Sequence, residues 1–442
     1  MTALTLLLVL VQAQAPEWKA GAATVKITPE EPVFMSGYAQ RNKPSTGVLA
    51  DIWAKALALE DAAGGRAVLV TTDLIGLKAD IAETIAGGIR AKTGLDRARI
   101  LLSSSHTHCG PNLGIDSTIG GARTPEDQAR TVAYTKALVD KVVGVAVEAL
   151  GTLSPAKLSY GVGVVHFPMN RREFTARGVI LGVNPRGPVD RSVPVLRVDA
   201  PDGTLRTVLF QCACHCTTLG GSFYEINGDY AGFAQAAVEK AFPGARAMFM
   251  AGCGGDANPW PRGTVENAKD HGHALASEVG RVLSLKLAPV RGPLAAEFAR
   301  VDAPFQKHDD LPSLAEKGPS SQRGVFKAQL ELVAKGQPIP TSYPVPISVW
   351  QFGDDLTLVG LSGEVVVDYV LRLEKALGPL KLWVAAYCHD VFGYLPSARV
   401  LEEGGYETRG VYYGSPGIFA PEAEAVVVRA VAELAAKAGR KP

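Results

Sequence analysis

Two histidines stand on either side of one threonine, directly after an apolar run, in the segment "ILLSSSHTHCGPNLG" at residues 100–114. Neutral imidazole is a common metal ligand, and its pKa lies close enough to neutrality for proton transfer. A strand that ends in His-Thr-His can therefore bind a metal ion, act as an acid and base, do both, or be an ordinary polar strand end. These alternatives make His106 and His108 the first candidates for chemistry.

A catalytic zinc site takes about three protein ligands from His, Asp, Glu or Cys and leaves a position for water. The chain contains no His-Glu-x-x-His motif, in which one helix would supply two ligands. A metal site would have to gather His106, His215 and a carboxylate from separate strand ends. The spacing alone leaves open whether these residues form such a site or are polar residues that happen to end strands.

A β-α-β unit would position His106. The run 66–77 predicts a buried strand, 78–94 predicts a helix, and 98–108 predicts the next strand. Right-handed crossovers make such strands parallel. Asp73 and His106 should therefore emerge at the same carboxyl edge, where open α/β sheets bind ligands.

Other predicted strands also end on polar residues. A hairpin over 194–216 leads its second strand to His215, and a strand within 245–263 delivers a glycine-rich loop. A later hairpin ends on Glu364, and another strand ends on Tyr394.

Helices are predicted at 127–150, 365–377 and 421–438, between or after these strands. We therefore expect an α/β fold with a mixed, largely parallel sheet, flanking helices and catalytic loops at strand ends. No clear boundary divides the chain, so we expect a single domain over 16–442.

Composition and charge exclude several classes of partner. Lys and Arg total 45 against 44 Asp and Glu, and 47% of the residues are hydrophobic. No basic patch or charged tail stands out, so nucleic acid and anionic membrane surfaces are not expected partners. No later run reaches the length of a membrane span. A small, uncharged or weakly charged substrate is favoured, and the oligomeric state stays open.

The first residues predict export. The segment 1–15 contains an apolar stretch over Leu4–Val11, followed by small residues at Ala13 and Ala15, which is the pattern of a secretory signal peptide. The alternative is a buried strand at the amino terminus. We expect a secreted or periplasmic protein.

A set of motifs resembles the catalytic domain of the neutral, non-lysosomal ceramidases, which are zinc-dependent amidases. The motifs are "SSSHTHCGP", "NRRE", "HCTTLGGSFYEINGDYAGF", "GGDANP", "SGE" and the pair Tyr394 and Tyr406. The similarity runs from about Ala20 to the terminal helix, and its specificity lies in the order and combination of the motifs. The resemblance implies a hydrolase that cleaves a carboxamide bond in an N-acyl amide or a lipid-like substrate such as ceramide, a sphingolipid.

The resemblance also implies roles for individual residues. One Zn²⁺ per chain would be held by His106, His215, Glu364 and Tyr394, and the catalytic residues would be His108, Arg171 and Tyr406. Zinc in such a shell lowers the pKa of a coordinated water toward roughly 7. His108 would then act as acid and base, while Arg171 and Tyr406 would donate hydrogen bonds to the oxyanion.

Four of these assignments have structural alternatives. Glu364 could simply begin the predicted helix that follows it, where a carboxylate favours the helix dipole. Tyr394 and Tyr406 could be ordinary half-buried tyrosines, and Arg171 could pair with Glu173 on the surface.

Two departures from the family pattern bear on the substrate. Asn258 stands where the ceramidases carry serine in Gly-Asp-x-Ser-Pro, and Asp256 is the aspartate of that segment, so we expect both residues at the substrate. The immunoglobulin-like domain of those enzymes has no counterpart before Pro442. We expect ceramide itself to be a poorer substrate than a shorter N-acyl amide or one with a different headgroup. The alternative functions are a zinc esterase or lactonase and a catalytically inactive binding protein on the same scaffold.

Overall fold

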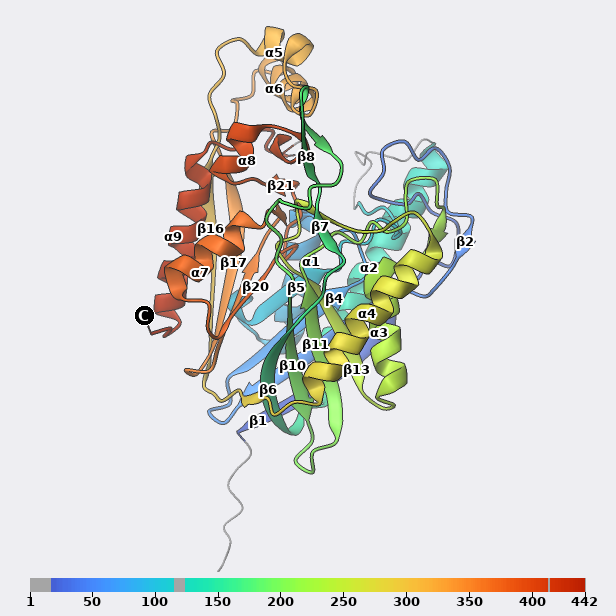
Figure 1. The fold of residues 1–442 in the computed structure, drawn as a ribbon, viewed down its shortest axis with the longest axis vertical. Helices are drawn as coiled ribbons and strands as arrows, with labels where there is room; N and C mark the ends of the chain where they lie inside the picture. Colours follow the sequence, from blue (N-terminus) through green and yellow to red (C-terminus); the bar gives the residue numbers. More distant parts are fainter. Residues whose placement is uncertain (1–16, 115–123, 412–413, 442) are drawn as a thin grey trace, which may run out of the picture.

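The computed structural model describes residues 17–114, 124–411 and 414–441. The signal peptide predicted at 1–15 lies outside the described residues. The described chain forms four layers, namely a group of helices, a nine-stranded sheet, a four-stranded sheet and a second group of helices (Figure 1).

The nine-stranded sheet is mixed. Its strands are β1 (Trp18–Lys26), β3 (Trp53–Asp61), β4 (Arg66–Thr72), β5 (Ile100–Ser104), β6 (Ser154–Val164), β10 (Ser192–Asp199), β11 (Leu205–Cys212), β13 (Arg246–Ala251) and β15 (Ala288–Pro289). They follow the order β13-β11-β10-β6-β1-β3-β4-β5, with β15 beside β6.

The second sheet has four strands in the order β16-β17-β18-β20. They are β16 (Leu294–Pro304), β17 (Ser342–Phe352), β18 (Leu356–Leu361) and β20 (Leu382–Ala385). Short pairs of strands complete the structure, namely β2 (Gly47–Val48) with β12 (Glu225–Ile226), β7 (Pro168–Asn170) with β14 (Ala257–Pro259), β8 (Arg172–Thr175) with β9 (Gly178–Leu181), and β19 (Glu364–Val365) with β21 (Tyr394–Leu395).

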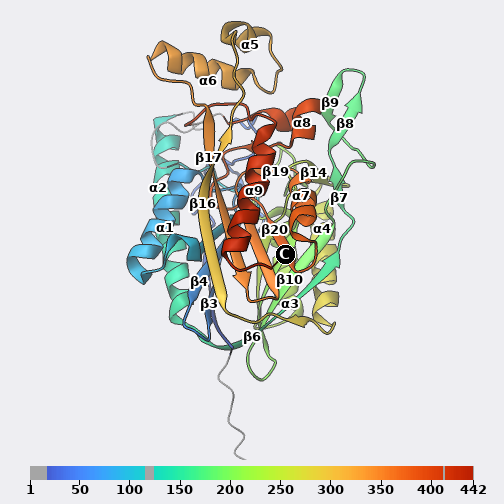
Figure 2. The same ribbon diagram turned by 90° about the vertical axis from the view of Figure 1, so that its left-hand side faces the viewer.

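The helices cover the outer faces of both sheets. The nine-stranded sheet carries α1 (Ala79–Thr93), α2 (Pro125–Gly151), α3 (Asp229–Ala241) and α4 (Val265–Leu283), and the second sheet carries α7 (Asp368–Leu377) and α9 (Glu422–Lys437). Helices α5 (Leu311–Lys317) and α6 (Arg323–Ala334) form a small lobe at one end of the molecule (Figure 2). The remaining short helices are α8 (Ala398–Glu403), η1 (Arg97–Arg99) and η2 (Tyr406–Thr408).

The layers follow from the alternation of side chains along the strands. Leu57 and Leu69 of the nine-stranded sheet pack with Trp350 and Leu358 of the second sheet in one buried cluster. Val68, next to Leu69, lies on the opposite face, in the cluster formed with α1 and α2. The nine-stranded sheet is therefore covered on both faces.

The predicted mixed α/β class with flanking helices is confirmed, and so is the parallel unit of β4, α1 and β5. The proportion of parallel strands differs from the prediction. The pairs β4–β5 and β11–β13 are parallel, but β10, β6, β1 and β3 follow one another as antiparallel neighbours. A sheet covered on both faces gives its antiparallel strands the continuous apolar runs that are typical of parallel strands, so the sequence pattern did not separate the two.

The two edge strands of the nine-stranded sheet lie next to each other, since β5 contacts β13. Both edges also meet the segment around the end of β20, where bridges join Ser103 to Cys388 and Gly252 to Ala385. The loops that follow the parallel strands therefore gather at one place. Within the described parts of the chain, every helix is too short or too polar to cross a bilayer.

Candidate metal centre and active-site cleft

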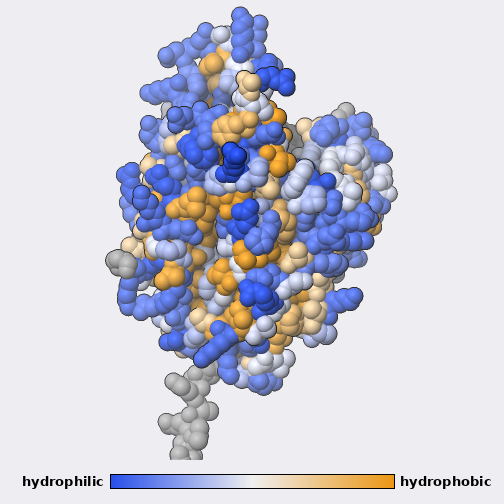
Figure 3. Space-filling model, in the orientation of Figure 1, coloured by the Kyte–Doolittle hydropathy of each residue, from blue (hydrophilic) through white to orange (hydrophobic). Residues whose placement is uncertain are grey.

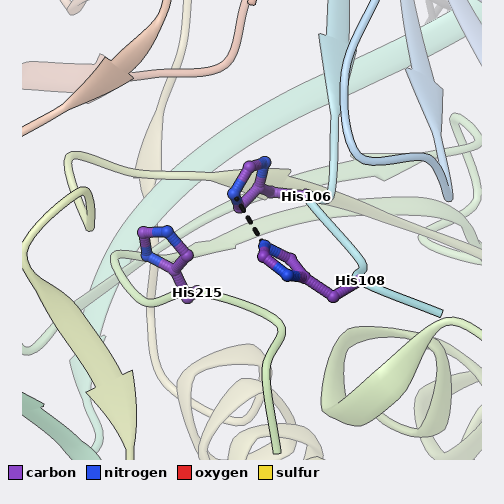
Figure 4. Close-up of side chains that lie close together, drawn as sticks. All are labelled: His106, His108 and His215. Atoms are coloured by element: carbon purple, nitrogen blue, oxygen red, sulfur yellow. Dashed lines mark hydrogen bonds between the residues drawn. The ribbon is translucent and has the colours of Figure 1, made fainter. Parts of the chain in front are cut away.

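Three histidines converge where these loops gather (Figure 4). His106 and His108 follow β5, and His215 follows β11. Their ring nitrogens lie within 4.8 Å of one another. His106 has a φ of 62°, a left-handed conformation that turns the chain after Ser104 and ends the predicted strand early. The structure brings together histidines that the sequence placed on separate strand ends.

Backbone carbonyls hold the outer nitrogens of two of these rings. His106 Nδ1 lies 2.6 Å from the carbonyl oxygen of Ile75, and His215 Nδ1 lies 2.8 Å from that of Gly254. A carbonyl oxygen only accepts hydrogen bonds, so both Nδ1 atoms carry the proton and both Nε2 atoms present a lone pair. Metal-binding histidines are oriented in this way, with the second nitrogen held by a partner.

Glu364 adds a carboxylate to these lone pairs. Its Oε2 lies 3.0 Å from His215 Nε2 and 3.3 Å from His106 Nε2. The two Nε2 lone pairs and the carboxylate oxygen face one another and repel unless a cation lies among them. These three ligand atoms therefore fit a divalent metal ion.

Tyr394 lies beside His215. Its hydroxyl oxygen is 3.4 Å from His215 Nε2 and accepts a 2.8 Å hydrogen bond from Arg171 Nη2. Glu364 and Tyr394 are paired residues of the parallel strands β19 and β21, so one short ladder positions both predicted ligands. Glu364 is therefore part of a strand and does not begin a helix, because α7 starts only at Asp368.

Arg171 is buried and does not pair with Glu173 on the surface. Its Nε donates a 2.8 Å hydrogen bond to Glu407 Oε1, and its Nη1 donates a 3.3 Å bond to Asn258 Oδ1. Arg172 donates to the second oxygen of Glu407 at 2.6 Å. Burial would raise the pKa of Glu407, but the two arginines lower it below its usual value. One carboxylate thus fixes the Arg171 guanidinium at the wall of the cleft.

His108 differs from the other two histidines. Its Nε2 lies 3.2 Å from His106 Nε2, and its buried Nδ1 has no hydrogen-bond partner among the described residues. Its ring packs edge-on against Tyr38, with the ring centroids 4.9 Å apart. Burial is the main cause that lowers the pKa of His108 well below its usual value. His108 is within reach of a metal ion as well, so its role as acid and base stays a prediction.

Two cavities meet at this centre. The first cavity, of about 420 Å³, lies between His108 and Trp260, and the second cavity, of about 480 Å³, lies between His106 and Phe392. Both are lined by Gly37, Tyr38, Ala39, His108, Tyr394 and Tyr406. A substrate can therefore extend from the histidines in two directions.

Two further predicted residues, Asn258 and Tyr406, lie in the wall of the first cavity. Tyr406 is 36% exposed, and its ring lies 5.6 Å from that of Tyr394. The Tyr406 hydroxyl also accepts a hydrogen bond from Arg409. Both residues thus occupy positions from which they could contact a ligand.

The structure does not bring Asp256 into either cavity, in contrast to the prediction. Its side chain is fully buried. One oxygen accepts a 2.9 Å hydrogen bond from the Val367 amide, and the other accepts a 3.3 Å bond from Asn170 Nδ2. Asp256 therefore ties the glycine-rich loop to the start of α7 and to β7, behind the cavity wall.

Two residues that shape the site were not predicted from the sequence. Glu407 is the counter-charge of Arg171, and Tyr38 packs against His108 while its hydroxyl donates to the Leu219 carbonyl. Neither residue belongs to a periodic pattern. The adjacent arginines in "NRRE" are the signal that could have indicated a buried acid, because two buried cations need one.

Fold and site together define a class of protein, an α/β protein whose strand ends bring together a group of histidines that could hold a metal ion. The family model described as "Neutral/alkaline non-lysosomal ceramidase, N-terminal" matches residues 18–259. The match spans more than half of the chain, and the chain belongs to this family.

Curated relatives include the neutral ceramidase of Pseudomonas aeruginosa, which is 27% identical over 224 residues, covering 49% of this chain and 33% of that protein. Neutral ceramidase B of Dictyostelium discoideum is 25% identical over 266 residues, covering 56% of this chain and 36% of that protein. The chain thus spans about a third of the length of these relatives.

Two solved structures share the fold. A structure titled "Ceramidase complexed with C2" has a TM-score of 0.75 at 20% identity and covers 95% of this chain and 75% of that chain. A crystal structure of neutral ceramidase from Pseudomonas aeruginosa has a TM-score of 0.73 at 21% identity and covers 97% of this chain and 76% of that chain. At these identities the similarity is one of fold, and it agrees with the mixed α/β architecture.

Proposed function

We propose that this protein is a zinc-dependent hydrolase that cleaves the carboxamide bond of an N-acyl, ceramide-like substrate. One observation carries the proposal: Nε2 of His106, Nε2 of His215 and Oε2 of Glu364 face one another while both Nδ1 atoms are already held by carbonyls. Two imidazoles and a carboxylate, with the Tyr394 hydroxyl beside them, are ligand types that suit zinc.

These residues would hold a zinc ion, which would supply a water of lowered pKa and polarise the carbonyl oxygen of the substrate. His108 is neutral at this site because burial lowers its pKa, so its imidazole takes a proton from the attacking water and passes it to the leaving amine. Arg171 and Tyr406 line the first cavity, where we expect them to donate hydrogen bonds to the carbonyl oxygen as it gains negative charge. Each such donor contributes on the order of 3 kcal/mol to transition-state stabilisation.

Apolar side chains support an acyl chain as part of the substrate. The second cavity is lined by Phe34, Met35 and Phe392. Leu181 in the wall of the first cavity is 49% exposed, and Phe174 in the same β8–β9 hairpin is 60% exposed. Figure 3 shows hydrophobic residues at the surface around the β8–β9 hairpin, where these two residues lie. Burying the apolar wall of the second cavity against an acyl chain stabilises the complex by about 25 cal/mol per Å² of apolar surface.

Hydrolysis of N-acyl amides of graded chain length, compared with matched esters and lactones in the presence and absence of Zn²⁺, tests the proposal. We expect zinc-dependent release of amine, and we expect a chelator to abolish it. In a matched variant, Glu364→Gln, which keeps the size of the side chain but removes its charge, both bound zinc and turnover should be lost. Faster ester cleavage without amide cleavage would instead make the protein an esterase, and bound zinc without turnover would make it a binding protein.

We also propose that the protein is exported, because residues 1–15 have the pattern of a signal peptide. Expression from the full sequence, followed by amino-terminal sequencing of the mature protein, tests this. The mature chain should begin after Ala13 or Ala15. Protein that keeps Met1 and stays with the cell extract would contradict export.

A further inference from the structure

The first cavity is lined by cations that differ in how they are neutralised. Arg171 and Arg262 both lie in its wall, and none of its lining residues is an aspartate or a glutamate. Arg171 is paired with Glu407 at 2.8 Å. Within the part of the chain that the structure describes, no carboxylate pairs with Arg262.

Among the described residues, Arg262 has one hydrogen bond, a 3.3 Å bond from its Nη2 to the Tyr38 hydroxyl. The side chain is half-buried in the cavity wall. A guanidinium group carries five N–H donors in a planar fork. Most of the donors of Arg262 are therefore left for a ligand or for water.

Asn258 adds donors of the same kind. Its Oδ1 accepts hydrogen bonds from Arg171 Nη1 at 3.3 Å and from Thr217 Oγ1 at 3.1 Å. Because arginine can only donate, this identifies Oδ1 as the oxygen and leaves the two N–H groups of the amide for another partner. The described residues show no acceptor for these N–H groups. Arg262 and Asn258 thus present donors to the cavity without matching acceptors.

We propose that Arg262 and Asn258 bind a carboxylate on the amine portion of the substrate, so that the protein prefers N-acyl amino acids to neutral N-acyl amines. The proposal rests on the amidase function proposed above. A planar guanidinium matches the two oxygens of a carboxylate, and such charge-assisted bonds are stronger than neutral ones. A neutral headgroup would leave these donors poorly paired, which a polar pocket penalises strongly.

The second cavity indicates which way the substrate lies. It carries the apolar side chains Phe34, Met35 and Phe392, which suit the acyl chain, and it joins the first cavity at His108. The scissile amide then lies at the junction, with the amine portion directed toward Arg262. Tyr38 contacts both His108 and Arg262, so one tyrosine side chain separates the reacting bond from the guanidinium.

This local arrangement differs from what the overall charge of the chain suggests. A formal net charge of +1 favours an uncharged or weakly charged substrate. The cavity wall, however, concentrates cations without acids. Overall charge averages over the whole surface, whereas the ligand meets only this wall.

The test uses zinc-loaded protein and N-dodecanoyl derivatives of glycine, β-alanine and γ-aminobutyrate, each paired with a neutral analogue in which a primary amide replaces the carboxylate. We expect a higher kcat/KM for the carboxylate member of at least one pair. Arg262→Gln should lower kcat/KM for that carboxylate roughly ten- to hundredfold and change the neutral analogue by no more than about twofold. Arg186→Gln, which removes an exposed cation outside the lining of both cavities, should leave both substrates unchanged.

Binding provides a second readout. Calorimetry with the same pairs in His108→Ala, where turnover should be slow, should show tighter binding of the carboxylate that is lost in His108→Ala/Arg262→Gln. A preference of the native protein for neutral analogues, or an equal loss for both members of a pair in Arg262→Gln, would overturn the carboxylate site. If the zinc-loaded protein hydrolyses no amide at all, the proposed amidase function fails, and the calorimetric comparison alone then decides whether Arg262 binds carboxylates.

Discussion

His389 and His106 are both buried histidines with left-handed backbones, at φ values of 59° and 62°, yet their hydrogen bonds differ in kind. His389 Nδ1 accepts a 3.1 Å bond from Arg97, and its Nε2 donates a 2.7 Å bond to Ser348. Burial and the nearby Arg97 and Arg300 charges lower the pKa of His389 well below its usual value, so the ring is neutral with both nitrogens paired. Nothing at this position calls for a further ligand.

At His106 the same residue type is left incomplete. Its Nδ1 is paired with a carbonyl, but its Nε2 lone pair faces the carboxylate of Glu364 and the Nε2 of His108. Burial, imidazole chemistry and backbone conformation are therefore shared by a structural and a candidate functional histidine. The two histidines differ in the partners of their ring nitrogens. Both nitrogens of His389 have partners that complete a hydrogen bond, whereas Nε2 of His106 is an acceptor that faces other acceptors.

The strongest test of this difference is to remove one ring at a time. His106→Ala and His215→Ala should each lose stoichiometric zinc and all measurable turnover, because a sparse shell cannot spare an imidazole. His389→Gln should cost stability but keep zinc, since its ring has no unpaired nitrogen. Metal content by atomic emission on folded protein measures both effects. Full zinc occupancy in His106→Ala or His215→Ala would contradict the distinction between these two histidines and His389.

The third histidine of the cluster sharpens the comparison. His108→Ala should keep zinc but lower kcat by roughly a hundred- to ten-thousandfold, because its proposed task is proton transfer. Single-turnover kinetics together with metal analysis separate the two properties. Loss of zinc in this variant would make His108 a ligand.

The buried ion pairs of Glu407 form a network in which every charge has a partner, unlike the histidine cluster. A substitution in this network should therefore change the stability of the protein. Glu407→Gln leaves Arg171 and Arg172 without their buried counter-charge and should destabilise the protein by about 3–5 kcal/mol in denaturant unfolding. Glu403→Gln is the matched control, since Glu403 also pairs with Arg172 but its side chain is 22% exposed, against 1% for Glu407. The control should cost about 1 kcal/mol or less. Equal losses of stability in Glu407→Gln and Glu403→Gln would show that burial does not determine the strength of these ion pairs.

Asp256 is a buried carboxylate with hydrogen bonds but no contacting cation, and this difference should be visible in the pH dependence of stability. Burial raises its pKa from 3.8 to about 7. Over this interval the unfolded chain has lost the proton and the folded chain still holds it, so stability falls as pH rises. Asp256→Asn should remove a slope of up to about 1.4 kcal/mol per pH unit, measured by urea unfolding at several pH values. An unchanged slope would contradict the raised pKa.

Local patterns predicted the parts of this molecule that local chemistry determines. The apolar runs and helical spacing around His106 predicted β4, α1 and β5 because each element is decided by its own residues. The placement of His106 and His215 at strand ends followed from the same runs. The family resemblance, and not spacing, supplied Glu364 and Tyr394 as candidates.

Features that depend on distant partners were beyond these patterns. The antiparallel centre of the large sheet depends on β1 inserting between β3 and β6, which no local run encodes. Glu407 is recognisable as part of the site only once Arg171 lies against it. Asp256 was assigned to the substrate from its motif, whereas packing directs its carboxylate to the amide of Val367.

The most direct test of the metal centre is the metal content of the native protein, purified without chelators and dialysed against equal concentrations of Zn²⁺, Mg²⁺ and Ca²⁺. Two imidazole nitrogens and a carboxylate favour zinc over the oxygen-seeking cations. We predict one zinc per chain, lost on treatment with a chelator and regained with activity on adding Zn²⁺. A folded protein that takes up no zinc, or that hydrolyses amides equally well after complete removal of metal, would contradict the assignment of His106, His215 and Glu364 as a metal site.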